Sequence, residues 1–87
     1  MMKQLTIEET KKIVVNATVL RAKYQYDEAI RLIEKNIDSF DPSLKLKGYL
    51  EMFYSAEEGN DHEFATRIAK KIAKEDPTLP SIQRYLR

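Results

Sequence analysis

The fold is decided by a short phrase that occurs twice, as YDEAI at residues 26–30 and as HEFAT at residues 62–66. Each copy runs through a helix-forming stretch to an Asp-Pro pair, at 41–42 and at 76–77. The two phrases are offset by 36 residues and the two prolines by 35. A period close to this, with two helices in each unit, is typical of helical repeat arrays. The sequence therefore predicts two copies of one helix-pair unit.

Helix signals continue on both sides of these phrases, and no alternation of apolar and polar residues lasts long enough for a confident strand. Apolar residues recur at spacings of three and four, which favours helices over about 7–23, from 26 to about 39, from 42 to a turn at 57–61, and from that turn to the Asp-Pro pair at 76–77. Asp41 is expected to cap the third helix, with Pro42 in the first turn, where a missing N–H costs nothing.

These elements predict a single all-helical domain over residues 1–87. Its units span about 7–41 and 42–77, and the tail from 78 to 87 forms a short fifth helix that caps them. Because an up-down helical bundle would bury the same apolar faces, it remains the alternative architecture.

Two capping signals and one glycine add local detail to the predicted helices. Thr6 and Glu9 stand three residues apart before an apolar run, which is the spacing of a capping box. Asn60 and Glu63 repeat that spacing and are expected to cap the fourth helix. Gly48 lies inside the third helix, where glycine costs about 1 kcal/mol relative to alanine. We therefore expect close packing against a neighbouring element at Gly48.

Composition limits the classes of function. The chain has 15 Lys+Arg and 14 Asp+Glu, so its formal net charge of +1 gives no strong attraction for nucleic acid or an anionic membrane. It has no cysteine and one histidine, which leaves no disulfide framework, thiolate nucleophile or Cys- or His-rich metal site. The longest aliphatic run, residues 13–15, is too short to span a bilayer, and the start lacks a secretory apolar core. A cytoplasmic location is therefore expected.

The repeat resembles the tetratricopeptide repeat family over roughly residues 10–87. The most specific stretch, 24–30 through the pair at 41–42, is similar to the family's turn and second helix. In the second unit, GND at 59–61, Ala65 and the pair at 76–77 match the family well. The resemblance implies two stacked antiparallel helix-turn-helix units, a fragment of a right-handed α-solenoid, with a short C-terminal capping helix.

Other positions match the family less evenly. Ala17 stands at the small position of the family's first helix and Leu20 at its next large position. Asn36, however, stands where the family usually has alanine. Phe53 stands at a small position, while the nearby large aromatic position is Ala56. A size swap of this kind conserves volume only with repacking.

The resemblance also implies a concave groove lined by the first helix of each unit. Carried over residue by residue, the groove would comprise Lys11, Val14, Val15, Thr18, Arg21, Lys47, Leu50, Glu51, Tyr54, Glu57, Glu58, Arg84 and Tyr85. Such a surface, apolar in the middle and charged at the ends, suits an extended or helical peptide with an apolar anchor. We therefore expect a non-catalytic protein-binding module: an adaptor, an assembly factor, or an inhibitor of the immunity type.

Two points bear on this groove hypothesis. Val14, Val15 and Leu50 are equally well explained as core residues, because so short a chain has few other places for a core. The family's Lys/Asn arrangement for gripping a C-terminal carboxylate is not reproduced, since Val14 and Thr18 stand at those positions. A clamp for chaperone tails is therefore not predicted.

Two further surfaces offer alternatives. The fourth helix carries a basic face that could touch RNA or an acidic protein, made of Arg67, Lys70, Lys71 and Lys74. No aromatic is interleaved with these charges in the sequence, so a solvated outer face is favoured over nucleic-acid binding. Repeat arrays generally need about three units to cover their faces, and this chain has two and a cap. Homodimerisation is therefore a second alternative.

Nothing in the sequence favours catalysis. His62 follows a turn at a helix start, and no serine or cysteine stands at a recognisable nucleophile spacing from it. The carboxylate pairs Glu8/Glu9 and Glu57/Glu58 are adjacent in sequence, which points their members to different sides of a helix. We expect no enzymatic activity, no cofactor and no metal.

Overall fold

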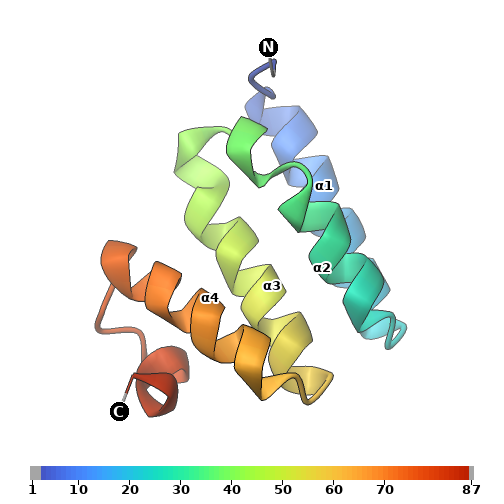
Figure 1. Ribbon diagram of the computed structural model, residues 1–87. Helices are drawn as coiled ribbons and strands as arrows, with labels where there is room; N and C mark the ends of the chain where they lie inside the picture. Colours follow the sequence, from blue (N-terminus) through green and yellow to red (C-terminus); the bar gives the residue numbers. More distant parts are fainter. Residues whose placement is uncertain (1–2, 87) are drawn as a thin grey trace.

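The computed structural model describes residues 3–86, and every regular element in that range is helical, which confirms the predicted all-α class (Figure 1). Met1, Met2 and Arg87, which begin the predicted domain and end the predicted cap, lie outside the described residues. The α-helices are α1 (Ile7–Ala22), α2 (Tyr26–Glu34), α3 (Lys45–Glu58) and α4 (His62–Glu75). The 3-10 segments are η1 (Ile37–Ser39), η2 (Pro42–Leu44) and η3 (Pro80–Tyr85).

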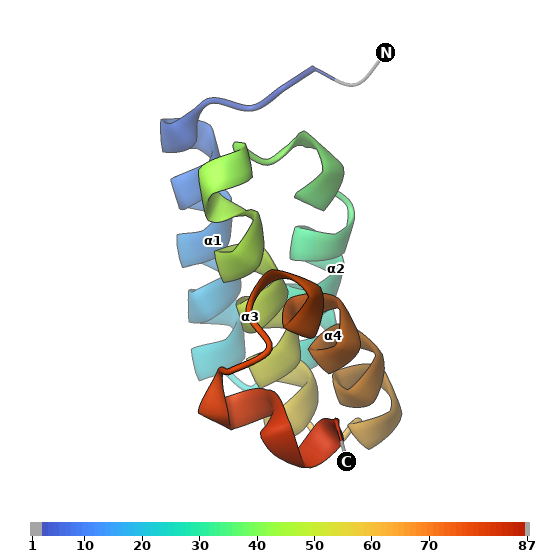
Figure 2. The same ribbon diagram turned by 90° about the vertical axis from the view of Figure 1, so that its left-hand side faces the viewer.

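Helices that follow one another in the sequence also pack together. α2 lies against α1, α3 against α2, and α4 against α3, while η3 folds back onto α4. α3 contacts α1 as well, although α2 separates them in the sequence. Figures 1 and 2 show α1 and α3 running side by side in the same direction. This pairing of α1 with α3 forms the surface described below.

A single core runs between these elements. Its largest fully buried side chains include Ile33 of α2, Phe53 of α3, Ile72 of α4 and Ile82 of η3. Phe53, which departs from the family pattern, is therefore a central core residue. Because Ile82 belongs to the tail, the 3-10 segment closes one end of the core.

Two local predictions are confirmed. Thr6 Oγ1 accepts from the Glu9 N–H at 3.1 Å, and Glu9 Oε1 accepts from the Thr6 N–H at 3.0 Å, so the capping box is complete. A Cβ on Gly48 would lie 2.7 Å from both Ile37 Cδ1 and Phe40 Cε2. Only a residue without a side chain lets α3 approach the segment that follows α2 so closely.

The second helix ends earlier than predicted, at Glu34 rather than about Ser39. The Asn36 side chain donates to the Leu32 carbonyl at 2.8 Å, and the Asn36 N–H bonds Ile33 O at 3.0 Å. The side chain thus takes the acceptor that a continuing α-helix would use. The chain then passes into η1.

The start of the third helix also differs from the prediction. Asp41 Oδ1 accepts from the Ser43 N–H at 3.0 Å as expected of a cap, but Pro42 begins the 3-10 segment η2 and α-helix starts only at Lys45. The Ser43 hydroxyl also donates to Asp41, and these bonds hold the pKa of the Asp41 carboxyl below its ordinary value. The predicted short fifth helix is present as the 3-10 helix Pro80–Tyr85.

The predicted capping box of Asn60 and Glu63 is wrong. Asp61 is the N-cap of α4, and its Oδ1 accepts from the Phe64 N–H at 3.1 Å. Asn60 instead has φ 63°, in the left-handed region that asparagine tolerates better than most residues. In the turn before α4, Asn60 therefore adopts the left-handed backbone conformation and Asp61 caps the helix.

Candidate functional site

A groove of about 380 Å³ lies between α1 and the start of α3. We call it the open half, and it is lined by Lys11, Val14, Val15, Thr18, Leu44, Lys47 and Glu51. All of these except Leu44 belong to the groove predicted from the sequence. Leu44, Lys47 and Glu51 are spaced by three and four residues, so they share one side of a helical stretch. This spacing is the signal that could have identified Leu44.

A buried threonine holds the two walls of the open half together. Thr10 Oγ1 donates to the Thr6 carbonyl at 2.8 Å and accepts from the Asp41 N–H at 3.2 Å. Thr10 is fully buried, so this bond fixes the start of η2 against α1. It places Leu44 and Lys47 opposite the exposed residues of α1. Sequence reasoning missed this link, because it joins residues 31 positions apart.

The floor of the open half is apolar. Val14 is 7% exposed and belongs to the core, whereas Val15 is 58% exposed and presents its methyl groups to solvent. The Thr18 hydroxyl donates to the Val14 carbonyl at 3.0 Å, so its hydrogen is used within α1. The core explanation therefore holds for Val14 but not for Val15. Leu50 is half-buried and packs against the core, outside the groove lining.

The rim of the open half is positively charged. Lys11 and Lys47 are exposed, and the ion pairs found within residues 3–86 include neither of them. The third charged lining residue, Glu51, accepts two hydrogen bonds from Arg21, through Nε at 3.2 Å and Nη2 at 3.3 Å. The Glu51 side chain is only 12% exposed. Its negative charge is thus matched, and the two lysines decide the charge of the groove.

The other predicted groove residues form a second region, which we call the closed half: Arg21, Leu50, Tyr54, Glu57, Glu58, Arg84 and Tyr85. Arg21 bridges the two halves, because its Nη1 donates to Glu58 and its Cζ lies 5.4 Å from the Tyr54 ring centroid. Burial lowers the pKa of Arg21, but the hydrogen bonds to Glu51 and Glu58 outweigh it and raise the pKa above its ordinary value. Arg21 is therefore a fixed positive charge.

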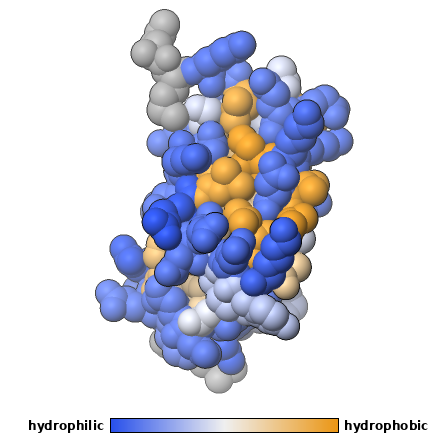
Figure 3. All heavy atoms as spheres, turned by 90° about the vertical axis from the view of Figure 1, so that its right-hand side faces the viewer, coloured by the Kyte–Doolittle hydropathy of each residue, from blue (hydrophilic) through white to orange (hydrophobic). Residues whose placement is uncertain are grey.

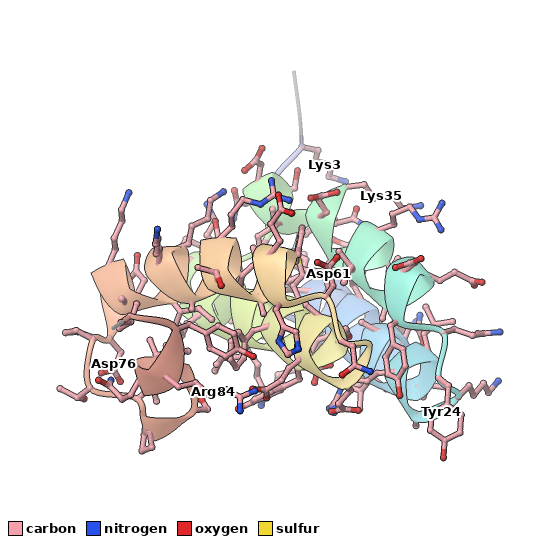
Figure 4. The ribbon with its side chains drawn as sticks, turned by 60° about the horizontal axis from the view of Figure 1, so that its bottom comes forward. Lys3, Tyr24, Lys35, Asp61, Asp76 and Arg84 are labelled. Carbon is pink, nitrogen blue, oxygen red and sulfur yellow. The ribbon has the colours of Figure 1, made fainter. Side chains whose placement is uncertain are left out.

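The tail completes the closed half. Arg84 Nη2 lies 2.7 Å from Glu57 Oε2, and the Tyr85 hydroxyl donates to the same oxygen at 3.2 Å. The Tyr85 ring meets Phe53 edge-on, with 5.3 Å between centroids. The hydrogen bond from Arg84 to the Tyr85 hydroxyl raises the pKa of Arg84. Figure 4 shows Arg84 extending from η3. The structure thus places the charged and aromatic residues of the closed half in contact with one another, while Leu50 packs against the core.

The basic face of α4 lies apart from both halves. Its residues Arg67, Lys70, Lys71 and Lys74 are exposed. Two of these cations lie over rings of their own chain, which the linear sequence did not indicate. Arg67 Cζ is 5.3 Å from the Phe64 centroid, and Lys71 Nζ is 6.0 Å from that of Tyr49. Intramolecular contacts therefore occupy part of this face.

A second hollow, of about 420 Å³, lies at the turns that precede α2 and α4. Asp27 and Asp61 line it, and acidic residues are expected at helix N-termini because they oppose the helix dipole. Tyr24 borders it with φ 64° and 79% exposure, and Figure 4 shows its ring projecting from the chain. The favourable interaction of Asp27 and Asp61 with the dipoles of α2 and α4 therefore accounts for the acidic residues of this hollow.

The remaining chemistry is limited. His62 is exposed at the first position of α4. Within residues 3–86 no group of three or more His, Cys, Asp or Glu side chains is arranged to hold a metal ion. No helix in the described part of the chain combines the length and apolarity needed to cross a bilayer.

Figure 3 shows hydrophobic atoms gathered among charged ones on the side where α1 and α2 lie.

Comparisons with protein-family models, with curated proteins and with solved structures find no match to this chain. The tetratricopeptide resemblance therefore stays a prediction from the residues.

Proposed function

We propose that this chain is a non-catalytic protein-binding module, an adaptor, assembly factor or inhibitor whose partner docks in the open half. In the same proposal, the two helix pairs stack as tetratricopeptide-like units, with α1 and α3 as their leading helices. The contact between α1 and α3 and their common direction support this arrangement. The groove then lies where a partner's segment would meet both units.

The observation that carries the proposal is the exposure of Val15 inside a hollow. A valine that is 58% exposed beside a groove of about 380 Å³ leaves apolar surface in contact with water. Fully burying a side chain of this size contributes roughly 1.5–3 kcal/mol, so a partner that covers Val15 gains a share of that. The closed half offers no comparable gain, because its aromatic and charged groups already contact each other.

Selection from a random peptide display library tests the proposal, with the wild-type chain as bait. Enriched peptides are then assayed against Val15→Asp, which puts a charge on the groove floor, and Lys70→Glu, a matched single change on the basic face. We expect Val15→Asp to abolish binding and Lys70→Glu to leave it unchanged. Enriched peptides that lose binding to Lys70→Glu but not to Val15→Asp would refute the proposal and favour the basic face.

A second copy of the chain is the competing occupant, because α1 also exposes Ile7 and Val19. Sedimentation velocity over a range of concentrations distinguishes this case. We expect one monomeric species for both the wild type and Val15→Asp. A dimer that dissociates only in Val15→Asp would assign the open half to self-association.

A further inference from the structure

We propose that the open half selects partner segments in which an aliphatic side chain is flanked by carboxylates, and that Arg21 sets this selectivity by neutralising Glu51. This inference rests on the proposed function, because it concerns the same groove. It adds the chemical class of the bound segment and a specificity-determining residue outside the groove lining.

The charge balance of the open half gives the first part of the inference. Lys11 and Lys47 stand on opposite walls, one on α1 and one on α3, and both are exposed. No carboxylate within residues 3–86 forms an ion pair with either of them. An acidic group that approaches the rim therefore meets two unpaired ammonium groups. A basic group meets like charge from both sides.

The apolar floor gives the second part. Val14, Val15 and Leu44 supply aliphatic surface between the two lysines, without an aromatic ring in the lining. Such a surface accepts a leucine-sized side chain, whereas carboxylates beside that side chain reach the rim. An anchor with flanking acids thus matches both the floor and the charge of the groove.

Arg21 gives the third part. It lies outside the groove lining, but its guanidinium forms a bidentate contact with Glu51, which does line the groove. A bidentate arginine–carboxylate pair is geometrically specific, and a lysine cannot reproduce it. Without Arg21, the Glu51 carboxylate would stand unpaired in the groove and repel an acidic segment. Arg21 therefore acts on selectivity through Glu51.

Three blocked hexapeptides serve as probes, with both ends capped so that no terminal carboxylate contributes. The acidic probe has two central leucines flanked on each side by aspartate and glutamate. The basic probe replaces each acid with lysine, and the leucine-free probe replaces each leucine with serine. Binding is measured by fluorescence anisotropy at low and high salt, and amide NMR shifts locate the contact.

We expect the acidic probe to bind in the open half, and the other two to bind at least about tenfold more weakly. Lys11→Glu combined with Lys47→Glu should weaken the acidic probe about tenfold, and added salt should weaken it in the wild type. Arg21→Gln should also weaken it, and Arg21→Gln with Glu51→Gln should restore it. That restoration separates a charge effect from structural damage, because the double variant lacks the ion pair altogether.

Two results would overturn the inference. Equal binding of the acidic and basic probes, unaffected by reversal of both lysines, would refute the charge selectivity. If Val15→Asp still abolished that binding, the proposed function would stand without this refinement. If no probe shifted the amides of the open half, the inference would fail outright, and the display selection would decide the proposed function separately.

Discussion

The open and closed halves come from the same predicted groove, yet they differ in what their charged groups contact. In the closed half, Arg21 is bonded to Glu58, and Arg84 to Glu57. In the open half, Lys11 and Lys47 lie beside the exposed Val15, and no ion pair within residues 3–86 involves either lysine. Charged residues that satisfy each other stabilise the fold, and those left unpaired beside apolar surface remain available to a partner. Only part of the predicted groove therefore offers a partner both apolar surface and unpaired charges.

The largest effect on stability is expected in the core beneath the closed half. Phe53→Ala removes a fully buried ring that also packs on Tyr54 and Tyr85. A truncation of this kind costs about 3–5 kcal/mol of unfolding free energy. Urea denaturation followed by circular dichroism measures the loss. A change below about 1 kcal/mol would contradict the central role assigned to Phe53 in the core.

The next effect is expected at the bridge between the halves. Arg21→Gln leaves Glu51, whose side chain is 12% exposed, without its cation. We expect a loss of about 1–2 kcal/mol, since a mostly buried charged group loses its hydrogen bonds. Arg21→Lys, the control, keeps the charge but not the bidentate geometry and should recover only part of the loss. Equal stability of all three proteins would show that the contact between Arg21 and Glu51 contributes nothing to the free energy of unfolding.

The sequence alone predicts the two α-helical pairs, the all-α class and the capping box of Thr6 and Glu9, because these follow from local spacing. The family resemblance also placed most residues of the open half in one groove, because it implies that the first helix of each unit lines that surface. It could not divide the groove, because that division depends on which carboxylate Arg21 reaches across 30 and 37 residues.

The sequence also misplaced some element ends. The stop of α2 is governed by the amide of Asn36, and the start of α4 by the choice between Asn60 and Asp61. In both places a polar side chain competes for backbone hydrogen bonds, and residue spacing does not say which geometry it takes.

A smaller effect is expected at acidic pH, at the end of the molecule where the open half begins. The backbone N–H and hydroxyl of Thr6 lower the pKa of Glu9 from its ordinary 4.5, and the Ser43 hydroxyl and N–H lower that of Asp41 from 3.8. Since both folded-state pKa values are depressed, their contribution is present above the ordinary values and is lost as the pH falls through the depressed ones.

Hydrogen exchange at a series of pH values, corrected for intrinsic rates, measures this effect. We expect protection in the first turn of α1 to fall below about pH 4.5, and protection in η2 to fall below about pH 3.8, each by more than protection in α4. Glu9→Gln should remove the pH dependence in α1 while leaving that in η2. A uniform loss along the whole chain would contradict a local origin.

The smallest stability effect is expected on the floor of the open half. Val15→Ala and Val15→Thr change a side chain that is 58% exposed, so unfolding free energy should shift by no more than about 0.5 kcal/mol. Thermal and urea unfolding both measure this. A loss comparable to that of Phe53→Ala would mean that Val15 is part of the core and not a docking surface.

An amide NMR titration of the full chain with a peptide recovered by display selection tests most directly whether a partner docks in the open half. We predict that the shifted amides concentrate on Lys11, Val15, Leu44 and Lys47, with little change at Tyr54 and Tyr85. Shifts confined to the basic face of α4, or spread over the closed half while the open half stays unchanged, would contradict it.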